Sequence, residues 1–281
     1  MLETIGVFKR YKKKPSALKY GYYYYAKMKL PFAKTKDRFV RVWLPEDYDF
    51  NNPNKRFPVI YFSDGQNLVD KYLSAYGEWE LDKSAHNLLK QGYQSFIAVG
   101  IDCPKDPMER MNELNPPYPV DIKKEGPKHP YANKYVEFIK DELKPLIDSL
   151  FNTLKDKDNT GIGGSSMGGI MSFYAYLKEP ETFGFSLSFS PPFFFYKEKH
   201  WYEILDEFDI GNKEYGKVFF YSGGLDFEEI FLNPTVYTYN YLKKRLKPGH
   251  VEMIVDTRQR HHEKAWSKYL KDALKFWLKK E

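Results

Sequence analysis

A serine framed by glycines is the feature of this sequence that points most directly to chemistry. The run from Gly163 to Gly169 reads Gly-Gly-Ser-Ser-Met-Gly-Gly and contains the pattern G-x-S-x-G centred on Ser166. The pattern is typical of a sharp turn that exposes a nucleophilic serine. Gly164 and Gly168 flank Ser166 because a Cβ at either position would collide with the crossing strand or helix. The sequence therefore predicts a serine nucleophile at position 166.

The segments on either side of this turn support the prediction. Residues 159–162 form a short segment that suits a buried strand, and residues 170–177 form an unbroken segment long enough for a helix. Strand, turn and helix in this order are the context in which G-x-S-x-G holds a nucleophile. Ser165 does not fit the same role, because its own frame places Met167 where the second glycine is needed.

A serine hydroxyl needs a base within hydrogen-bond reach and a third group that orients the base. On a strand–turn–helix of this kind the chain order is serine, acid, histidine. His261 and His262 follow the last predicted strand by a short loop, which is the required place. His200 lies among charged residues, and His250 opens the last strand at its wrong end. These patterns alone do not separate His261 from His262.

The acid is expected after the preceding strand. Asp226 follows the predicted strand 217–222 through a turn that contains two glycines, and it is our candidate. Glu228 and Glu229 are close enough in sequence to be rivals. The alternative role for Asp226 is that of a helix N-cap, which a glycine followed by an aspartate also encodes.

An oxyanion hole requires two backbone N–H groups aimed at the developing negative charge. One is expected from Met167, the residue after the nucleophile. The other is expected from the loop at 64–67, where Gly65 permits tight passage and Gln66 is the best-placed donor. The structural alternative is an ordinary Asp-Gly turn at this position.

Composition places the chain among globular proteins. It has 281 residues, of which 42% are hydrophobic, and a formal net charge of +6. Cys103 is the one cysteine, and residues 1–8 lack the order of a signal peptide, so we expect a cytoplasmic protein. The basic cluster at 9–14 is interpreted as a solvated turn or as an edge that resists strand pairing, because no broad basic stripe accompanies it. We expect no contact with nucleic acid or membrane.

The predicted elements indicate an α/β fold. Two N-terminal strands are followed by alternating strands and helices, which favours a mostly parallel sheet covered on both faces. We expect strands at 20–28, 38–44, 57–62, 95–101, 159–162, 183–189, 217–222 and 250–255, and helices at 81–90, 131–150, 170–177, 201–208, 233–246 and 263–280. Residues 1–281 are expected to form a single domain. The proline-rich segment 103–130 is expected to be an ordered loop or lid.

With these motifs in place, the chain resembles the Putative esterase family of α/β-hydrolases, which includes esterase D, feruloyl esterases, enterochelin esterases and mycolyltransferases. The resemblance runs over nearly the whole length after about residue 38. It is carried by Asp64-Gly65-Gln66-Asn67-Leu68, by Trp79, by Val99-Gly100-Ile101-Asp102, by Arg110 with Glu113, by the run from Gly163 to Gly169, and by Ser188-Phe189-Ser190-Pro191. It implies an α/β-hydrolase fold with antiparallel N-terminal strands.

The resemblance also implies roles for individual residues. The family's acid follows a G-x-x-D or G-x-x-E turn, which falls on Asp226. Its histidine opens the pattern H-x-E-x-x-W, which falls on His261 with Trp266 five residues later. Its second oxyanion donor follows Asp-Gly, which falls on Gln66. One departure is visible, since Arg260 stands where the family commonly has a glycine.

Four residues are candidate contacts for a substrate. Asp64 lies in the predicted oxyanion loop, and Arg110 lies in the proline-rich segment, where a structural ion pair is the alternative role for Arg110 and its neighbour Glu113. Phe193 follows the strand after the nucleophile and lines either a pocket or the core. Trp79 is open to the same two interpretations.

The expected function is hydrolysis of carboxylic esters. Ser166 would attack the carbonyl carbon, His261 would act as general base, and Asp226 would orient the base. The expected substrate is a small ester, with an aromatic or carbohydrate-linked group among the candidates, and no metal or organic cofactor is required. The competing predictions are an acyltransferase with the same three residues and a non-catalytic binding module with the same fold.

Overall fold

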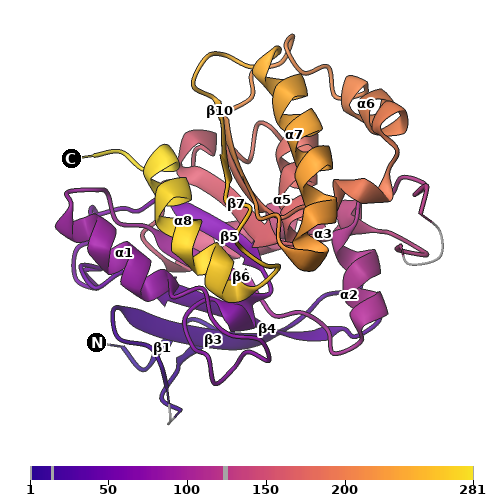
Figure 1. The fold of residues 1–281 in the computed structure, drawn as a ribbon. Coiled ribbons are helices and arrows are strands. Elements are labelled where there is room, and N and C mark those ends of the chain that lie inside the picture. Colours follow the sequence, from indigo (N-terminus) through magenta and orange to yellow (C-terminus); the bar gives the residue numbers. More distant parts are fainter. Residues whose placement is uncertain (1, 14–15, 123–125, 281) are drawn as a thin grey trace.

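The computed structural model describes residues 2–13, 16–122 and 126–280. Lys14 of the basic cluster and residues 123–125 of the proline-rich segment lie outside the described residues. One twisted sheet runs through the molecule, and helices cover both of its faces (Figure 1). Within the described ranges, no helix has both the length and the apolar character that a bilayer crossing requires.

The sheet has two parts with different strand directions. In spatial order its strands are β1 (Thr4–Ile5), β2 (Phe8–Arg10), β3 (Tyr22–Lys29), β4 (Asp37–Leu44), β6 (Ile97–Ile101), β5 (Val59–Ser63), β7 (Thr160–Ser165), β8 (Phe185–Phe189), β9 (Lys217–Ser222) and β10 (Val251–Val255). Neighbouring strands from β1 to β6 are antiparallel, and those from β6 to β10 are parallel. The predicted fold class is confirmed.

The helices pack on the sheet according to the alternation of its side chains. They are α1 (Leu81–Lys90), α2 (Pro107–Leu114), α3 (Ala132–Phe138), α4 (Lys144–Leu150), α5 (Met167–Lys178), α6 (Glu198–Asp206), α7 (Glu229–Lys243) and α8 (Glu263–Trp277). On β5, Ile60 and Phe62 face the core under α1 and α8, whereas Val59 and Tyr61 face the core under α3 to α5. Because successive side chains of a strand point to opposite faces, a strand covered on both sides is apolar throughout.

Two local features differ from the expectation. The segment 103–130 contains α2, which begins at Pro107 behind the N-cap Asp106, whose side chain accepts the Met108 N–H. This eight-residue helix was not predicted, because the many prolines of the segment favoured a loop. The predicted helix 131–150 is interrupted by a π-helical turn at Ile139–Leu143, just before Pro145. The wider turn accommodates a proline that has no N–H to donate.

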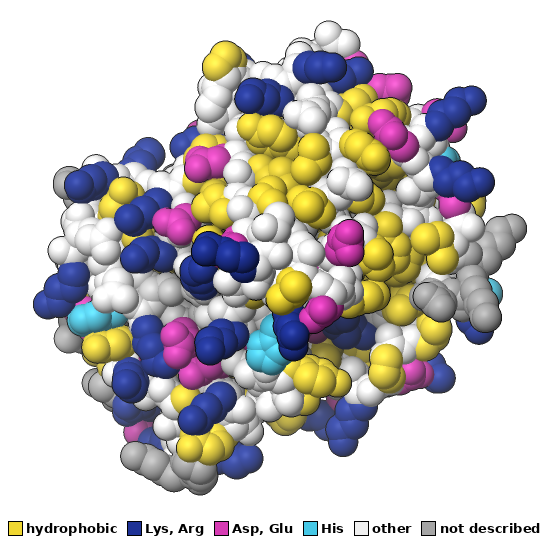
Figure 2. Space-filling model, viewed as in Figure 1, with side chains coloured by type: hydrophobic (Ala, Val, Ile, Leu, Met, Phe, Trp, Pro, Cys, Tyr) yellow, Lys and Arg dark blue, Asp and Glu magenta, His cyan; other side chains and the backbone are white. Residues whose placement is uncertain are grey.

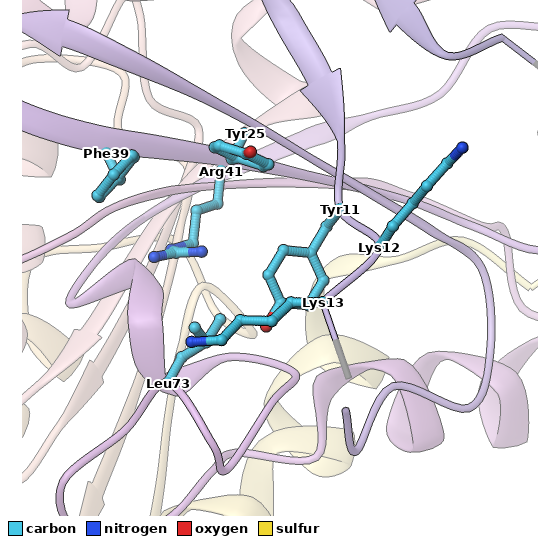
Figure 3. Close-up of a pocket in the computed structure, with 7 residues that line it drawn as sticks. All are labelled: Tyr11, Lys12, Lys13, Tyr25, Phe39, Arg41 and Leu73. Carbon is cyan, nitrogen blue, oxygen red and sulfur yellow. The ribbon is translucent and has the colours of Figure 1, made fainter. Parts of the chain in front are cut away.

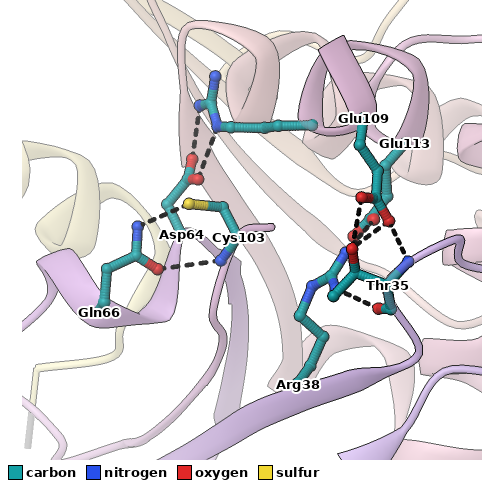
Figure 4. Close-up of polar contacts among 8 residues, drawn as sticks. Thr35, Arg38, Asp64, Gln66, Cys103, Glu109 and Glu113 are labelled. Atoms are coloured by element: carbon teal, nitrogen blue, oxygen red, sulfur yellow. Dashed lines mark hydrogen bonds and ion pairs between the residues drawn. The ribbon is translucent and has the colours of Figure 1, made fainter. Parts of the chain in front are cut away.

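A buried ionic cluster holds α2 against the antiparallel part of the sheet (Figure 4). Arg38 on β4 lies 2.7 Å from Glu113 and 3.4 Å from Glu109, and all three side chains are almost fully buried. Glu109 also accepts hydrogen bonds from the hydroxyl and the backbone N–H of Thr35. Burial raises the pKa of the Glu113 carboxyl to about 7, whereas the Thr35 donors and Arg38 lower the pKa of Glu109 despite the opposing effect of burial.

A cavity of about 250 Å³ lies beside the N-terminal strands (Figure 3). Its walls combine the rings of Tyr11, Tyr25 and Phe39 with the cations of the predicted basic cluster and Arg41. Two of these cations are already neutralised, because Lys12 lies 2.6 Å from Glu3 and Arg41 makes two 2.6 Å hydrogen bonds to Asp102. The cavity is therefore a weakly charged aromatic recess rather than a strong anion site.

The raised pKa of Glu113 predicts how the free energy of unfolding depends on pH. Between about pH 4.5 and about 7 the folded protein keeps the Glu113 proton that the unfolded chain releases, so this group lowers stability as pH rises through that window. We expect Glu113→Gln to remove this part of the pH dependence. Glu109→Gln is the matched control and should leave the slope in this window unchanged, because the lowered pKa of Glu109 keeps that carboxyl ionised in both the folded and the unfolded chain above about pH 4.5. Urea unfolding across this pH range measures both, and identical profiles for Glu113→Gln and wild type would contradict the assignment.

Candidate active site

Ser166 stands on a strained turn between β7 and α5. Its backbone has φ 55° and ψ −124°, a combination that non-glycine residues rarely adopt. The Ser166 N–H donates to the Phe189 carbonyl at 2.9 Å, which ties the turn to the end of β8. Strain of this kind typically costs about 1–3 kcal/mol and persists where the surrounding structure fixes it. The half-buried serine therefore sits at the carboxyl end of a central parallel strand.

The flanking glycines are required by close backbone packing. A Cβ on Gly164 would lie 2.6 Å from the carbonyl carbon of Gly168, and a Cβ on Gly168 would overlap the Ser63 hydroxyl. A Cβ on Gly169 would lie 2.6 Å from the Phe189 carbonyl oxygen. Since real Cβ atoms do not approach so closely, the turn and the first helical residues can only be built with glycine at these positions.

The structure separates the two neighbouring histidines. His261 is mostly buried, and its Nδ1 is hydrogen-bonded to Oε2 of Glu228. The His261 ring stacks on Phe231 at 4.5 Å between centroids. His262 is 54% exposed at its side chain, and its Nδ1 accepts the Lys264 N–H at 3.1 Å, so it caps α8. Of the two, only His261 has a carboxylate partner suited to orienting a base.

Asp226 does not take the place expected for the acid. Its side chain is 58% exposed and lies 2.8 Å from Arg260, the residue that departs from the family pattern. Glu228 instead contacts His261, and its side chain is fully buried. Its Oε1 accepts the Gly223 N–H at 2.8 Å and the Ser190 hydroxyl. The contact to His261 that the sequence expects from Asp226 is thus made by Glu228, one of the two rivals left open by the sequence.

Local geometry explains why Glu228, and not Asp226, contacts His261. Residues Asp226–Glu228 form a 3-10 turn, so the chain reverses and the side chain two positions after Asp226 points back under the strand ends. A Cβ on Gly223 would lie 2.6 Å from Cγ of Glu228. The glycine turn that suggested an acid at 226 therefore makes room for the carboxylate at 228.

The two N–H groups predicted to form an oxyanion hole belong to Met167 and Gln66. Met167 is the first residue of α5, so its N–H has no acceptor within the helix. Gln66 lies in the 3-10 turn Gly65–Asn67 after β5, and neither N–H has a backbone acceptor in the part of the chain described. The Gln66 side chain accepts the Cys103 N–H at 3.0 Å and donates to its Sγ at 3.1 Å (Figure 4). Burial raises the pKa of the Cys103 thiol to about 12.

The remaining polar candidates, Asp64 and Arg110, form an ion pair with each other. Asp64 has a left-handed backbone with φ 54° and precedes the turn that carries Gln66. Its carboxylate accepts two hydrogen bonds of 2.7 Å from the guanidinium of Arg110 on α2 (Figure 4). A bidentate pair of this kind fixes geometry as well as adding energy. Arg110 thus anchors α2 to the predicted oxyanion turn, which is the structural role considered for it.

Trp79 and Phe193 are packed into the interior. Trp79 is 3% exposed and stacks on Phe189 at 5.5 Å, while Phe193 is fully buried and packs on Trp201 at 4.7 Å. Both therefore occupy the core position that the sequence left open as the alternative. Sequence reasoning missed Phe227 and Phe231, which follow Asp226 at helical spacing and both contact His261.

An apolar surface borders the His261 side of the site. Phe227 is 59% exposed, and Leu225 and Ile230 are also exposed beside it. Figure 2 shows apolar side chains gathered over α7 and β10, the elements next to this turn. Across the described residues, no group of three or more histidine, cysteine or acidic side chains is arranged to hold a metal ion.

Comparisons with known proteins identify the family of this chain. The model of the family described as Putative esterase matches residues 33–277. The uncharacterized protein YbbA of Bacillus subtilis is 26% identical over 161 residues, which cover 54% of this chain and 55% of that protein. The match thus spans about half the length of this curated relative.

Solved structures show the same fold. The BES protein from Bacillus cereus superimposes with a TM-score of 0.70 at 20% identity, covering 95% of this chain and 98% of that one. An IroE-like serine hydrolase from Shewanella oneidensis superimposes with a TM-score of 0.68 at 18% identity, covering 92% and 80%. At these identities the likeness establishes the fold.

The exchange of Asp226 for Glu228 can be checked by NMR of the histidine rings. An imidazole Nδ1–H that donates to a buried carboxylate resonates far downfield of other ring protons. We expect one such resonance in the wild type, its loss in Glu228→Gln, and its retention in Asp226→Asn. Loss in Asp226→Asn with retention in Glu228→Gln would contradict the assignment.

Proposed function

The chain belongs to the Putative esterase family, and from this premise we propose that it is a carboxylic ester hydrolase acting through Ser166, His261 and Glu228. The observation that carries the proposal is the hydrogen bond between His261 and the fully buried carboxylate of Glu228. It accompanies a serine on a strained turn at the carboxyl end of β7, in the same parallel part of the sheet. Base, orienting acid and nucleophile are the three groups that acyl transfer requires.

The histidine tautomer follows from its carboxylate partner. Because Nδ1 of His261 is held by Glu228, the neutral ring carries its proton there and leaves Nε2 as the basic nitrogen. The Ser166 hydroxyl gives its proton to Nε2 as its Oγ attacks the carbonyl carbon of the ester. The carbonyl oxygen becomes an oxyanion, and the N–H groups of Met167 and Gln66 stabilise it.

The reaction then proceeds in two halves. The oxyanion collapses, the bond to the alcohol oxygen breaks, and protonated His261 returns its proton to that oxygen, which leaves an acyl-enzyme on Ser166. A water molecule gives a proton to Nε2 and attacks the acyl carbon. Collapse of the second oxyanion breaks the bond to Oγ, which takes back the proton, and the carboxylic acid departs.

The surroundings of His261 favour substrates with an apolar group. The ring is enclosed by Phe231 and by the more exposed Phe227, and Leu225 and Ile230 extend the apolar surface. Burying such a group against aromatic side chains contributes about 25 cal/mol for each square ångström removed from water. The proposal is therefore an esterase for small esters with an apolar acyl or alcohol part.

The nucleophile is tested by covalent labelling. A fluorophosphonate probe should form one adduct on Ser166 of the wild type, located by intact mass and peptide mapping, and a short-chain nitrophenyl ester should block it. Ser166→Ala should lose both the adduct and ester hydrolysis while keeping its circular dichroism spectrum. Continued hydrolysis by a folded Ser166→Ala variant would contradict the mechanism.

Paired variants test the base and the acid. We expect kcat/KM to fall about 10⁴-fold in His261→Ala and in Glu228→Gln, as is typical when a base or its orienting carboxylate is removed. The neighbours His262→Ala and Asp226→Asn are the controls and should stay within about threefold of wild type, since neither side chain touches the His261 ring. Steady-state rates on a nitrophenyl ester, corrected for the folded fraction measured by circular dichroism, give all four values. A larger loss in either control than in its partner would reject the assignment.

A further inference from the structure

A chain of hydrogen bonds runs from α8 to the carboxylate of Glu228. The indole N–H of Trp266 donates to the Ser190 hydroxyl at 3.0 Å, and that hydroxyl is hydrogen-bonded to Oε1 of Glu228. Ser190 and Glu228 are fully buried, and Trp266 is 4% exposed. The other oxygen of Glu228 contacts His261. Four side chains from three separate segments thus form one continuous polar path inside the protein.

The direction of this path is fixed by chemistry. An indole nitrogen can only donate, and an ionised carboxylate can only accept. The Ser190 hydroxyl must therefore accept from Trp266 and give its own proton to Glu228. Charge-assisted bonds of this type are about twice as strong as neutral ones. With the Gly223 N–H at 2.8 Å, Oε1 of Glu228 has two donors.

The backbone at Ser190 shows that this hydroxyl is held in place. Ser190 has φ 46°, a left-handed conformation that glycine adopts without strain. Its N–H donates to the Tyr221 carbonyl at 2.7 Å, which fixes the residue between the ends of β8 and β9. A serine here carries a conformational cost that a glycine would not, and its hydroxyl is the group that reaches Glu228.

Trp266 also touches the histidine. Its ring meets the His261 ring edge to face, with centroids 5.0 Å apart and planes at 89°. Its backbone N–H donates to the His262 carbonyl at 3.3 Å in the first turn of α8. One side chain therefore packs on the base and, through Ser190, supports the acid.

We propose that Ser190 and Trp266 are positioning residues of the active site: Trp266 orients the Ser190 hydroxyl, and Ser190 holds the Glu228 carboxylate so that its second oxygen faces His261. The proposal rests on the proposed function in one respect, namely that Glu228 is the acid. It assigns a role to the tryptophan of the H-x-E-x-x-W pattern and to the last serine of the S-x-S-P pattern.

The physical consequence is a coupled change in rate and pH dependence. Without the Ser190 hydroxyl, Oε1 keeps only the Gly223 N–H, and the carboxylate rotates more freely. A carboxylate that has lost a donor accepts more strongly from its remaining partner, so it favours the protonated His261 ring. The acid limb of the pH profile of kcat/KM should move to higher pH. Loss of one charge-assisted hydrogen bond should lower the maximal kcat/KM of that profile about tenfold to hundredfold.

The other titratable groups around His261 stay unchanged in this comparison. They are Glu263 at the start of α8, the chain neighbours Arg260 and His262, and Asp226, which Arg260 pairs. None of them is hydrogen-bonded to Ser190 or Trp266. A shift of the acid limb of the kcat/KM profile in variants of Ser190 or Trp266 therefore reports on Glu228.

The experiment compares Ser190→Ala, Trp266→Phe and the double variant with wild type. Trp79→Phe is the matched control, because Trp79 packs 6.1 Å from Trp266 but has no hydrogen bond to Ser190 or Glu228 among the described residues. The first measurement is kcat/KM against pH for a nitrophenyl ester, normalised by fluorophosphonate titration of Ser166. The second is NMR titration of the His261 ring, assigned with His261→Gln.

Ser190→Ala should shift both the limb and the ring titration to higher pH, Trp266→Phe should shift them less, and Trp79→Phe should shift neither. Since Trp266 acts through Ser190, the double variant should titrate like Ser190→Ala alone. Additive shifts, or losses of activity with unchanged titration, would overturn the proposal. If the wild type neither labels nor turns over esters, the proposed function fails, and the NMR titration still decides whether Ser190 and Trp266 control the Glu228–His261 pair.

Discussion

The burial of one carboxylate governs the arrangement of the whole site. Glu228 lies out of water, and within the described ranges no lysine or arginine is among its hydrogen-bonding partners. An ionised group in that position is costly unless donors surround it. The donors are the Gly223 N–H, the Ser190 hydroxyl and the His261 ring. They come from the connections after β9, β8 and β10, so a stable carboxylate requires three strand ends to meet within hydrogen-bond distance.

The parallel half of the sheet meets that requirement directly. Strands β7, β8, β9 and β10 are neighbours in this order, and their carboxyl ends lie at one edge. The residues that follow them are Ser166, Ser190, Glu228 and His261, so the order along the chain is also the order across the sheet. The carboxyl ends of parallel strands are the usual place for a ligand site in this class of fold. The strand order therefore brings the residues of the proposed triad to the same edge of the sheet.

The opposite side of the site depends on ionic contacts and on close backbone packing. A Cβ on Gly65 would lie 2.5 Å from the carbonyl carbon of Gly100, so the predicted oxyanion turn packs directly on β6. Asp64 and Arg110 join this turn to α2, and the buried cluster of Arg38 with Glu109 and Glu113 joins α2 to β4. These pairs make the proline-rich segment part of the framework of the site.

The sequence by itself determined the fold class, the positions of most elements and the turn at Ser166, because these follow from local patterns: apolar periodicity, glycines beside a serine, and a helix that begins after two histidines. The bounds of α1 and β9 match the expectation residue for residue. Only the tertiary structure showed that Glu228 rather than Asp226 contacts His261, that His262 caps α8, and that Trp79 and Phe193 lie in the core. Those choices depend on where a side chain points after a 3-10 turn and on what packs against it from distant segments. Residues two positions apart look equivalent in a sequence, whereas burial and hydrogen-bond partners in three dimensions make them different.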